Sequence, residues 1–134
     1  MTARQIGRAN PTSQARLQLI LILLAAWNLA SFALLLFNTT LSNIEGVDGV
    51  LGARAYGGAT AVLAIAYLYA ARNPVRHRFV LWLAAVEQVI ALFSYAFHWA
   101  RGDFSFAEMA LPITAAAALL ALLIANMPRQ TDSF

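Results

Sequence analysis

Four long apolar runs follow one another along the chain, separated by short polar segments. They cover approximately residues 17–37, 50–71, 79–100 and 104–127. A helix needs about 20 residues to cross a hydrocarbon core roughly 30 Å thick, and each run reaches that length. The runs are continuous and lack a period of two, which excludes the strands of a membrane barrel. The pattern therefore predicts an all-α fold with four transmembrane helices.

Short polar segments mark the ends of the expected helices. Arg72-Asn73-Pro74 stops the second run, and Arg101-Gly102-Asp103 makes a tight turn before the fourth. Such short connections force neighbouring helices to run antiparallel, so we expect an antiparallel four-helix bundle. The predicted parts of the chain are a basic arm (1–16), a membrane domain (17–127) and a polar tail (128–134).

The composition agrees with a membrane protein and excludes several classes of site. Hydrophobic residues make up 61% of the chain and charged residues only 11%, whereas a soluble domain has about a quarter charged residues. The absence of Cys excludes disulfides, thiolate metal sites and Cys catalysis. All nine basic residues are Arg, which fits a bacterial protein from a GC-rich genome. They lie at helix ends instead of forming a groove-lining patch, so we expect no nucleic-acid partner.

The arginines also predict an orientation, because short cytoplasmic segments are enriched in basic residues. Seven arginines fall on one side of the expected membrane and two on the other. The first group is Arg4, Arg8, Arg16, Arg72, Arg76, Arg78 and Arg129, and the second is Arg54 and Arg101. We therefore expect both termini and the middle connection on the cytoplasmic side of a bacterial inner membrane. Headgroup contacts are expected from Arg16, Arg72, Arg76, His77 and Arg78.

Glu87 is the residue most suggestive of function, because it lies roughly 12 Å inside the third expected span. An acid at that depth costs a few kcal/mol and normally faces the bundle interior or a wet cavity. Ser94 and His98 follow it on the same helical face. Polar residues of the first two spans lie at similar heights, which predicts a polar pocket open to the outer side. The candidate ligand or proton site consists of Glu87, Asn28, Ser94, His98 and Thr60, with Ser31 nearby.

A purely structural role for Glu87 is the alternative. In that interpretation it is a protonated acid, hydrogen-bonded to Asn28 or to a backbone carbonyl, that locks the bundle. His98 is either a proton relay or metal ligand, or an interfacial hydrogen-bonding residue. A bis-histidine haem is excluded, because His77 lies on the opposite side of the expected membrane.

A second polar cluster, Arg54, Tyr56 and Glu108, is expected on the outer side. Glu108, His98, Asp103 or a lipid phosphate are candidate partners of Arg54, and a snorkelling arginine is the alternative. Ser105 and Glu108 match the capping-box pattern. Gly57-Gly58 indicates close helix packing. We found no metal-ligand spacing, nucleophile with its base, or phosphate-binding loop, so we predict no catalytic residue and no cofactor.

Several of these residues support a resemblance to a known group. Arg54-Ala55-Tyr56-Gly57 opens the second span, Glu87-Gln88 lies within the third, and His98 lies near its end. Together with four helices in 134 residues, this resembles the small bacterial membrane proteins of the broad DoxX-like group. That group is linked by name to quinol oxidase accessory subunits, and the resemblance implies no established activity.

Three functions follow as expectations. The first is a non-catalytic accessory or assembly subunit of a respiratory or photosynthetic membrane complex, whose partners are other subunits or a second copy of the chain, together with membrane lipids. The second is a binder or carrier of a small hydrophobic ligand, such as a quinone or a lipid, in the pocket around Glu87. The third is a small proton-coupled transporter that uses Glu87 and His98. An enzyme using the same two residues belongs with this third expectation, and a non-catalytic role is favoured over it.

Overall fold

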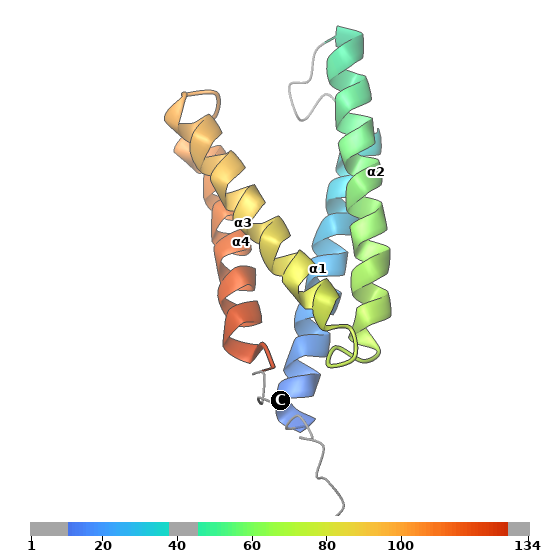
Figure 1. Cartoon of the computed structure of the whole chain (residues 1–134). Coiled ribbons are helices and arrows are strands. Elements are labelled where there is room, and N and C mark those ends of the chain that lie inside the picture. The colour runs from blue at the N-terminus through green and yellow to red at the C-terminus, as the bar shows by residue number, and fades with distance from the viewer. Residues whose placement is uncertain (1–10, 38–45, 129–134) are drawn as a thin grey trace, which may run out of the picture.

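The structure, a computed structural model, describes residues 11–37 and 46–128 of the chain. These residues form four α-helices and no strand (Figure 1): α1 (Pro11–Phe37), α2 (Gly46–Ala71), α3 (Arg78–Ala100) and α4 (Phe106–Asn126). All four helices are long and apolar enough to cross a membrane. The prediction of an all-helical chain with four candidate membrane spans is confirmed.

Three helices begin earlier than the expected spans, α3 by a single residue, and α4 begins later. α1 begins at Pro11, inside the segment expected to be a basic arm, so Arg16 is helical. Proline suits a first helical turn because its missing N–H has no partner there in any case. α2 begins at Gly46, ahead of the apolar run that starts near residue 50. α4 begins at Phe106, directly after the capping residue Ser105.

A Schellman turn ends α3. Gly102 has a positive φ of 76°, which glycine adopts without steric cost. The Gly102 N–H donates to the Trp99 carbonyl and the Asp103 N–H donates to the His98 carbonyl, both at 3.0 Å. These two bonds define the motif, and they bring the Asp103 side chain back beside the last turn of α3.

The four helices pack as two pairs that meet at one end (Figure 1). α1 lies along α2 and α3 lies along α4, while contact between α2 and α3 is sparse. We call the end with the connection 72–77 the core end, and the end with the turn 101–105 the open end. The hydrophobic core occupies the core end, because its large members come from the first half of α1 and α3 and the last half of α2 and α4. They are Leu17, Leu21, Leu24, Tyr67, Leu81 and Leu123.

Two local contacts hold this arrangement. Arg78, at the start of α3, donates from Nη2 to the Pro128 carbonyl just after α4, at 2.9 Å. In the α1–α2 pair, a Cβ added at Gly57 would meet the Leu35 Cβ at 3.3 Å, so the two backbones approach closely there. Gly58 has nothing within 4 Å of such a Cβ. Close packing was therefore correctly predicted at Gly57, and the same prediction at Gly58 is wrong.

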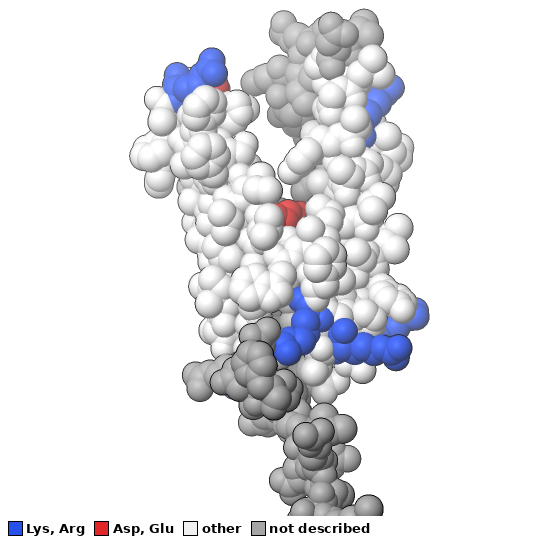
Figure 2. Space-filling model, viewed as in Figure 1, with Lys and Arg blue, Asp and Glu red and all other residues white. Residues whose placement is uncertain are grey.

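Towards the open end the two helix pairs diverge and leave a hollow between them (Figure 2). Arginine side chains gather at the core end, and others lie towards the tips of the two arms (Figure 2). The core-end group within the described residues includes Arg72, Arg76 and Arg78, which belong to or adjoin the α2–α3 connection. Arg54 and Arg101 belong to the open end. Among the described arginines, the arrangement separates the two groups that the sequence predicted. Arg4, Arg8 and Arg129 lie outside the described residues.

Candidate ligand-binding cavity

A cavity of about 850 Å³ fills the hollow between the two helix pairs. All four helices line it, and most of the lining is apolar. Its polar side chains are Asn28, Ser31, Tyr56, Thr60, Glu87, Gln88, Ser94, Tyr95 and Glu108. Binding sites for small molecules measure about 300–1,000 Å³ and combine apolar walls with a few polar groups. An acidic side chain is visible at the floor of the hollow (Figure 2).

Glu87 is held at this cavity by two neutral donors. The Tyr67 hydroxyl of α2 donates a short hydrogen bond to Glu87 Oε2. The Gln88 amide donates to the same oxygen at 3.2 Å. Tyr67 and Gln88 are buried, whereas Glu87 is half-buried and lines the cavity. We call these three residues the Glu87 cluster.

Tyr67 is the contact that the sequence analysis missed. A signal was present, because a tyrosine hydroxyl deep in an apolar span needs a hydrogen-bond partner. Tyr67 lies towards the core end of α2 and is fully buried. Its partner was not evident, because helical periodicity does not fix how two helices are rotated against each other.

The other predicted site residues of α1 and α2 line the cavity without touching Glu87. Asn28 Nδ2 donates to the Leu24 carbonyl at 3.1 Å, and no hydrogen bond joins Asn28 to Glu87, so Asn28 is not the partner that the structural alternative offered beside a backbone carbonyl. Ser31 and Thr60 bond in the same way to the carbonyls of Trp27 and Gly57, at 3.0 and 2.7 Å. Each of these hydrogen bonds stays within its own helix, and the hydroxyl oxygens keep acceptor capacity.

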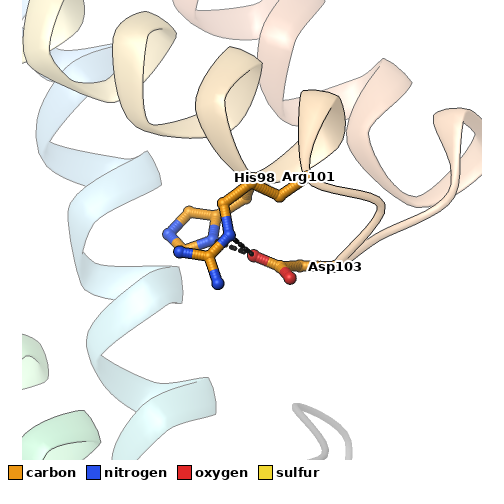
Figure 3. A network of polar contacts seen from close by, with 3 residues as sticks. All are labelled: His98, Arg101 and Asp103. Atoms are coloured by element: carbon orange, nitrogen blue, oxygen red, sulfur yellow. Dashed lines mark hydrogen bonds and ion pairs between the residues drawn. The ribbon is translucent and has the colours of Figure 1, made fainter.

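The predicted stripe on α3 is only partly present. Ser94 lines the cavity with Glu87, but His98 does not. His98 Nδ1 lies 2.8 Å from Asp103 Oδ2, and Arg101 Nε lies 3.6 Å from the same oxygen (Figure 3). The Schellman turn brings this carboxylate to His98, whose side chain bonds to Asp103 and is not part of the cavity lining. Of the roles considered for His98, this contact agrees with that of a hydrogen-bonding residue.

The expected outer-side cluster also divides. Tyr56 and Glu108 line the cavity, whereas Arg54 is exposed and does not. Within the described residues Arg54 forms no ion pair, so none of its three candidate protein partners is bound to it. Glu108 forms the predicted capping box, with Oε2 accepting from the Ser105 N–H and Oγ at 2.7 Å each.

The basic residues at the core end are partly engaged inside the protein. His77 Nδ1 lies 2.9 Å from the Asn73 carbonyl, and its ring meets the edge of Tyr69. Arg78 holds the Pro128 carbonyl, as described above. Arg16, Arg72 and Arg76 are exposed, and the headgroup contacts expected of them stay predictions.

The ionisable side chains that line the cavity are acidic. It includes the carboxyl groups of Glu87 and Glu108, and among the described residues no Arg or His lines it. No group of three His, Asp or Glu side chains comes together anywhere in the described ranges, as a metal site would need. The arrangement can hold a hydrophobic body against its walls and hydrogen-bond a polar group at the Glu87 cluster.

Comparison with protein-family models, with curated proteins and with solved structures found no match to this chain. The assignment of function therefore depends on the cavity and the residues that line it.

Proposed function

We propose that this chain is a multi-pass membrane protein that binds a small, amphipathic, lipid-soluble ligand in the cavity around Glu87. The observation that carries the proposal is the cavity itself, about 850 Å³ in volume and bounded by all four helices. A helix bundle held together only for structural reasons has no need of such a volume, since helices associate in membranes through close packing. The cavity walls instead interrupt that packing between the two helix pairs.

The lining residues suggest how the ligand lies. Apolar side chains such as Leu34, Leu63 and Ile90 would surround its hydrophobic body. The carboxyl group of Glu87, fixed by Tyr67, would face its polar group, with the hydroxyls of Ser94 and Thr60 as further hydrogen-bonding groups. A quinone or a lipid, the ligands expected from the sequence, has the required combination of a hydrophobic body and a polar head.

The orientation of the bundle belongs to the same proposal. With the basic core end in the bacterial cytoplasm, the helices run antiparallel, both termini lie inside, and the cavity opens to the outer side of the inner membrane. The distribution of Arg72, Arg76 and Arg78 against Arg54 and Arg101 supports this orientation. The ligand would then enter from the outer leaflet or from the outer aqueous phase.

The accessory-subunit hypothesis and the DoxX-like resemblance both stay predictions. Exposed apolar residues such as Leu19, Val62 and Phe93 suit lipid tails and a partner subunit equally well. The transporter hypothesis uses Glu87 and His98 together, but His98 is paired with Asp103 and does not line the cavity with Glu87, so it has less support than ligand binding. Ligand binding therefore ranks first.

The test compares two tryptophan substitutions on α3. Ala91 lines the cavity one turn beyond Glu87, so Ala91→Trp places an indole over the carboxyl group. Ala96 is exposed and does not line the cavity, so Ala96→Trp is the matched control. We expect small molecules that co-purify with the wild type in lipid nanodiscs to be lost from Ala91→Trp and kept by Ala96→Trp, as measured by mass spectrometry. Equal retention by the two variants, or no retained ligand in the wild type, would contradict the proposal.

A further inference from the structure

We propose that the polar head of the ligand is a cation, and that the cavity selects lipophilic organic cations such as hydrophobic amines or quaternary onium compounds. This inference rests on the proposed function, because it names the chemical class of ligand for the same cavity. Three properties of the lining support it: its charge, an available oxygen on Glu87, and its aromatic side chains.

In the part of the chain that the structure describes, the lining has acidic side chains and no basic side chain beside them. Glu87 and Glu108 line it, and no basic side chain among the described residues does so. The arginines of the open end are engaged or located elsewhere, since Arg101 lies beside Asp103 and Arg54 is outside the lining. A buried or half-buried acid in a membrane is normally paired with a cation or placed on an ion or substrate pathway. Because the described part of the chain supplies no such cation, a ligand can provide it.

The hydrogen bonds of Glu87 leave one oxygen for the ligand. Tyr67 and Gln88 both donate to Oε2, so this oxygen acts as an acceptor. Oε1 has no hydrogen bond within the described residues. Every buried side-chain oxygen of these residues has a hydrogen-bond partner, so Oε1 is not a buried atom. Oε1 is therefore accessible, and the cavity is the space that it adjoins. A carboxylate oxygen accepts a hydrogen bond from an ammonium group and attracts an onium group that has no N–H.

Aromatic side chains from three helices complete the arrangement. Trp27 of α1, Tyr56 of α2 and Tyr95 of α3 all line the cavity. The faces of aromatic rings attract cations, and quaternary ammonium ligands are recognised in this way in other proteins. Aromatic walls also accommodate the hydrophobic substituents of such a ligand. An anionic ligand would meet two carboxyl groups and no basic partner, so the same lining rejects it.

The test uses three probes of similar shape and different charge on the full chain in nanodiscs of uncharged phosphatidylcholine. The probes are tetraphenylphosphonium, the neutral triphenylphosphine oxide and the anion tetraphenylborate, and binding is measured by equilibrium dialysis. We expect the cation to bind the wild type, Glu87→Gln to weaken that binding at least about tenfold, and Glu108→Gln to weaken it less. Glu87→Gln keeps an acceptor for the Tyr67 hydroxyl, so the variant is expected to fold. Asp103→Asn, which removes an acid outside the cavity, is the control and should bind like the wild type.

The outcomes separate this inference from the proposed function. One outcome is that the neutral probe binds as well as the cation, that Ala91→Trp blocks this binding and that Glu87→Gln does not affect it. In that case the cavity binds ligands, but the inference of a cation is wrong. If no probe binds and Ala91→Trp changes no retained ligand, both proposals are wrong. If Asp103→Asn weakens cation binding as much as Glu87→Gln, the effect comes from surface charge, and the inference is likewise overturned.

Discussion

The hydroxyl group of Tyr67 on α2 donates a hydrogen bond to the carboxyl group of Glu87 on α3. Contact between these two helices is otherwise sparse, since each packs mainly against its own hairpin partner. The bond therefore joins the two helix pairs at the place where the packed core end gives way to the cavity. It fixes the position of the carboxyl group and leaves Oε1 accessible.

Replacing Tyr67 with Phe removes this bond while keeping the buried ring. We expect Tyr67→Phe to destabilise the protein by about 0.6–2 kcal/mol, the range found for side-chain hydrogen bonds between membrane helices. Tyr69→Phe is the control on the same helix, because Tyr69 is exposed and its hydroxyl makes no hydrogen bond within the described residues. The unfolding midpoints of both variants are measured by heating the protein in mild detergent and monitoring the folded fraction by size-exclusion chromatography. Equal midpoints for the two variants would show that the Tyr67 hydroxyl contributes nothing to stability.

The close approach of α1 and α2 gives a second prediction. Gly57→Val forces side-chain atoms against Leu35 and Phe32, which already lie 3.3–3.7 Å from the position of an added Cβ. Overpacking of this kind costs about 1–3 kcal/mol. Gly58→Val makes the same chemical change where nothing lies within 4 Å, so it should cost much less. The same heating assay measures both variants, and the prediction is wrong if Gly58→Val is the more damaging.

The turn between α3 and α4 gives a third prediction. Gly102 has a positive φ, so Gly102→Ala places a Cβ in a left-handed conformation and should cost about 1–2 kcal/mol. Gly52 lies inside α2 with open space around it, so Gly52→Ala should be neutral or slightly stabilising. We expect protease cleavage at the turn to rise in Gly102→Ala and to stay unchanged in Gly52→Ala. A Gly102→Ala variant as resistant as the wild type would argue against this turn.

The helices could be predicted from the sequence because each apolar run is long and uninterrupted, and because Pro74 and Gly102 mark clear ends. The capping box at Ser105 and Glu108 is equally local and was also predicted. Asn28 and Thr60 were expected at heights similar to that of Glu87, and Ser94 on the same face of its helix. The structure puts all three in the lining of one cavity with Glu87.

The contacts between helices could not be predicted from the pattern of residues along the chain. Helical periodicity assigns a residue to a face of its own helix, but the rotation of each helix against its neighbours depends on packing of the whole bundle. The structural alternative therefore offered Asn28 or a backbone carbonyl as the partner of Glu87, where the structure has Tyr67. His98 failed for a different reason, because the Schellman turn brings a carboxylate back to it that helical spacing alone does not reveal.

The last prediction concerns the side of the membrane to which the cavity opens. The natural chain has no cysteine, so a single introduced cysteine reports its own accessibility. Asn73 lies exposed at the core end, and Ala107 lies exposed at the open end. Because the arginines of the core end favour the cytoplasm, a membrane-impermeant maleimide should label Ala107→Cys in intact cells. Asn73→Cys should react only after the membrane is permeabilised. The opposite labelling pattern would place the cavity on the cytoplasmic side, and its ligand would then have to arrive from within the cell.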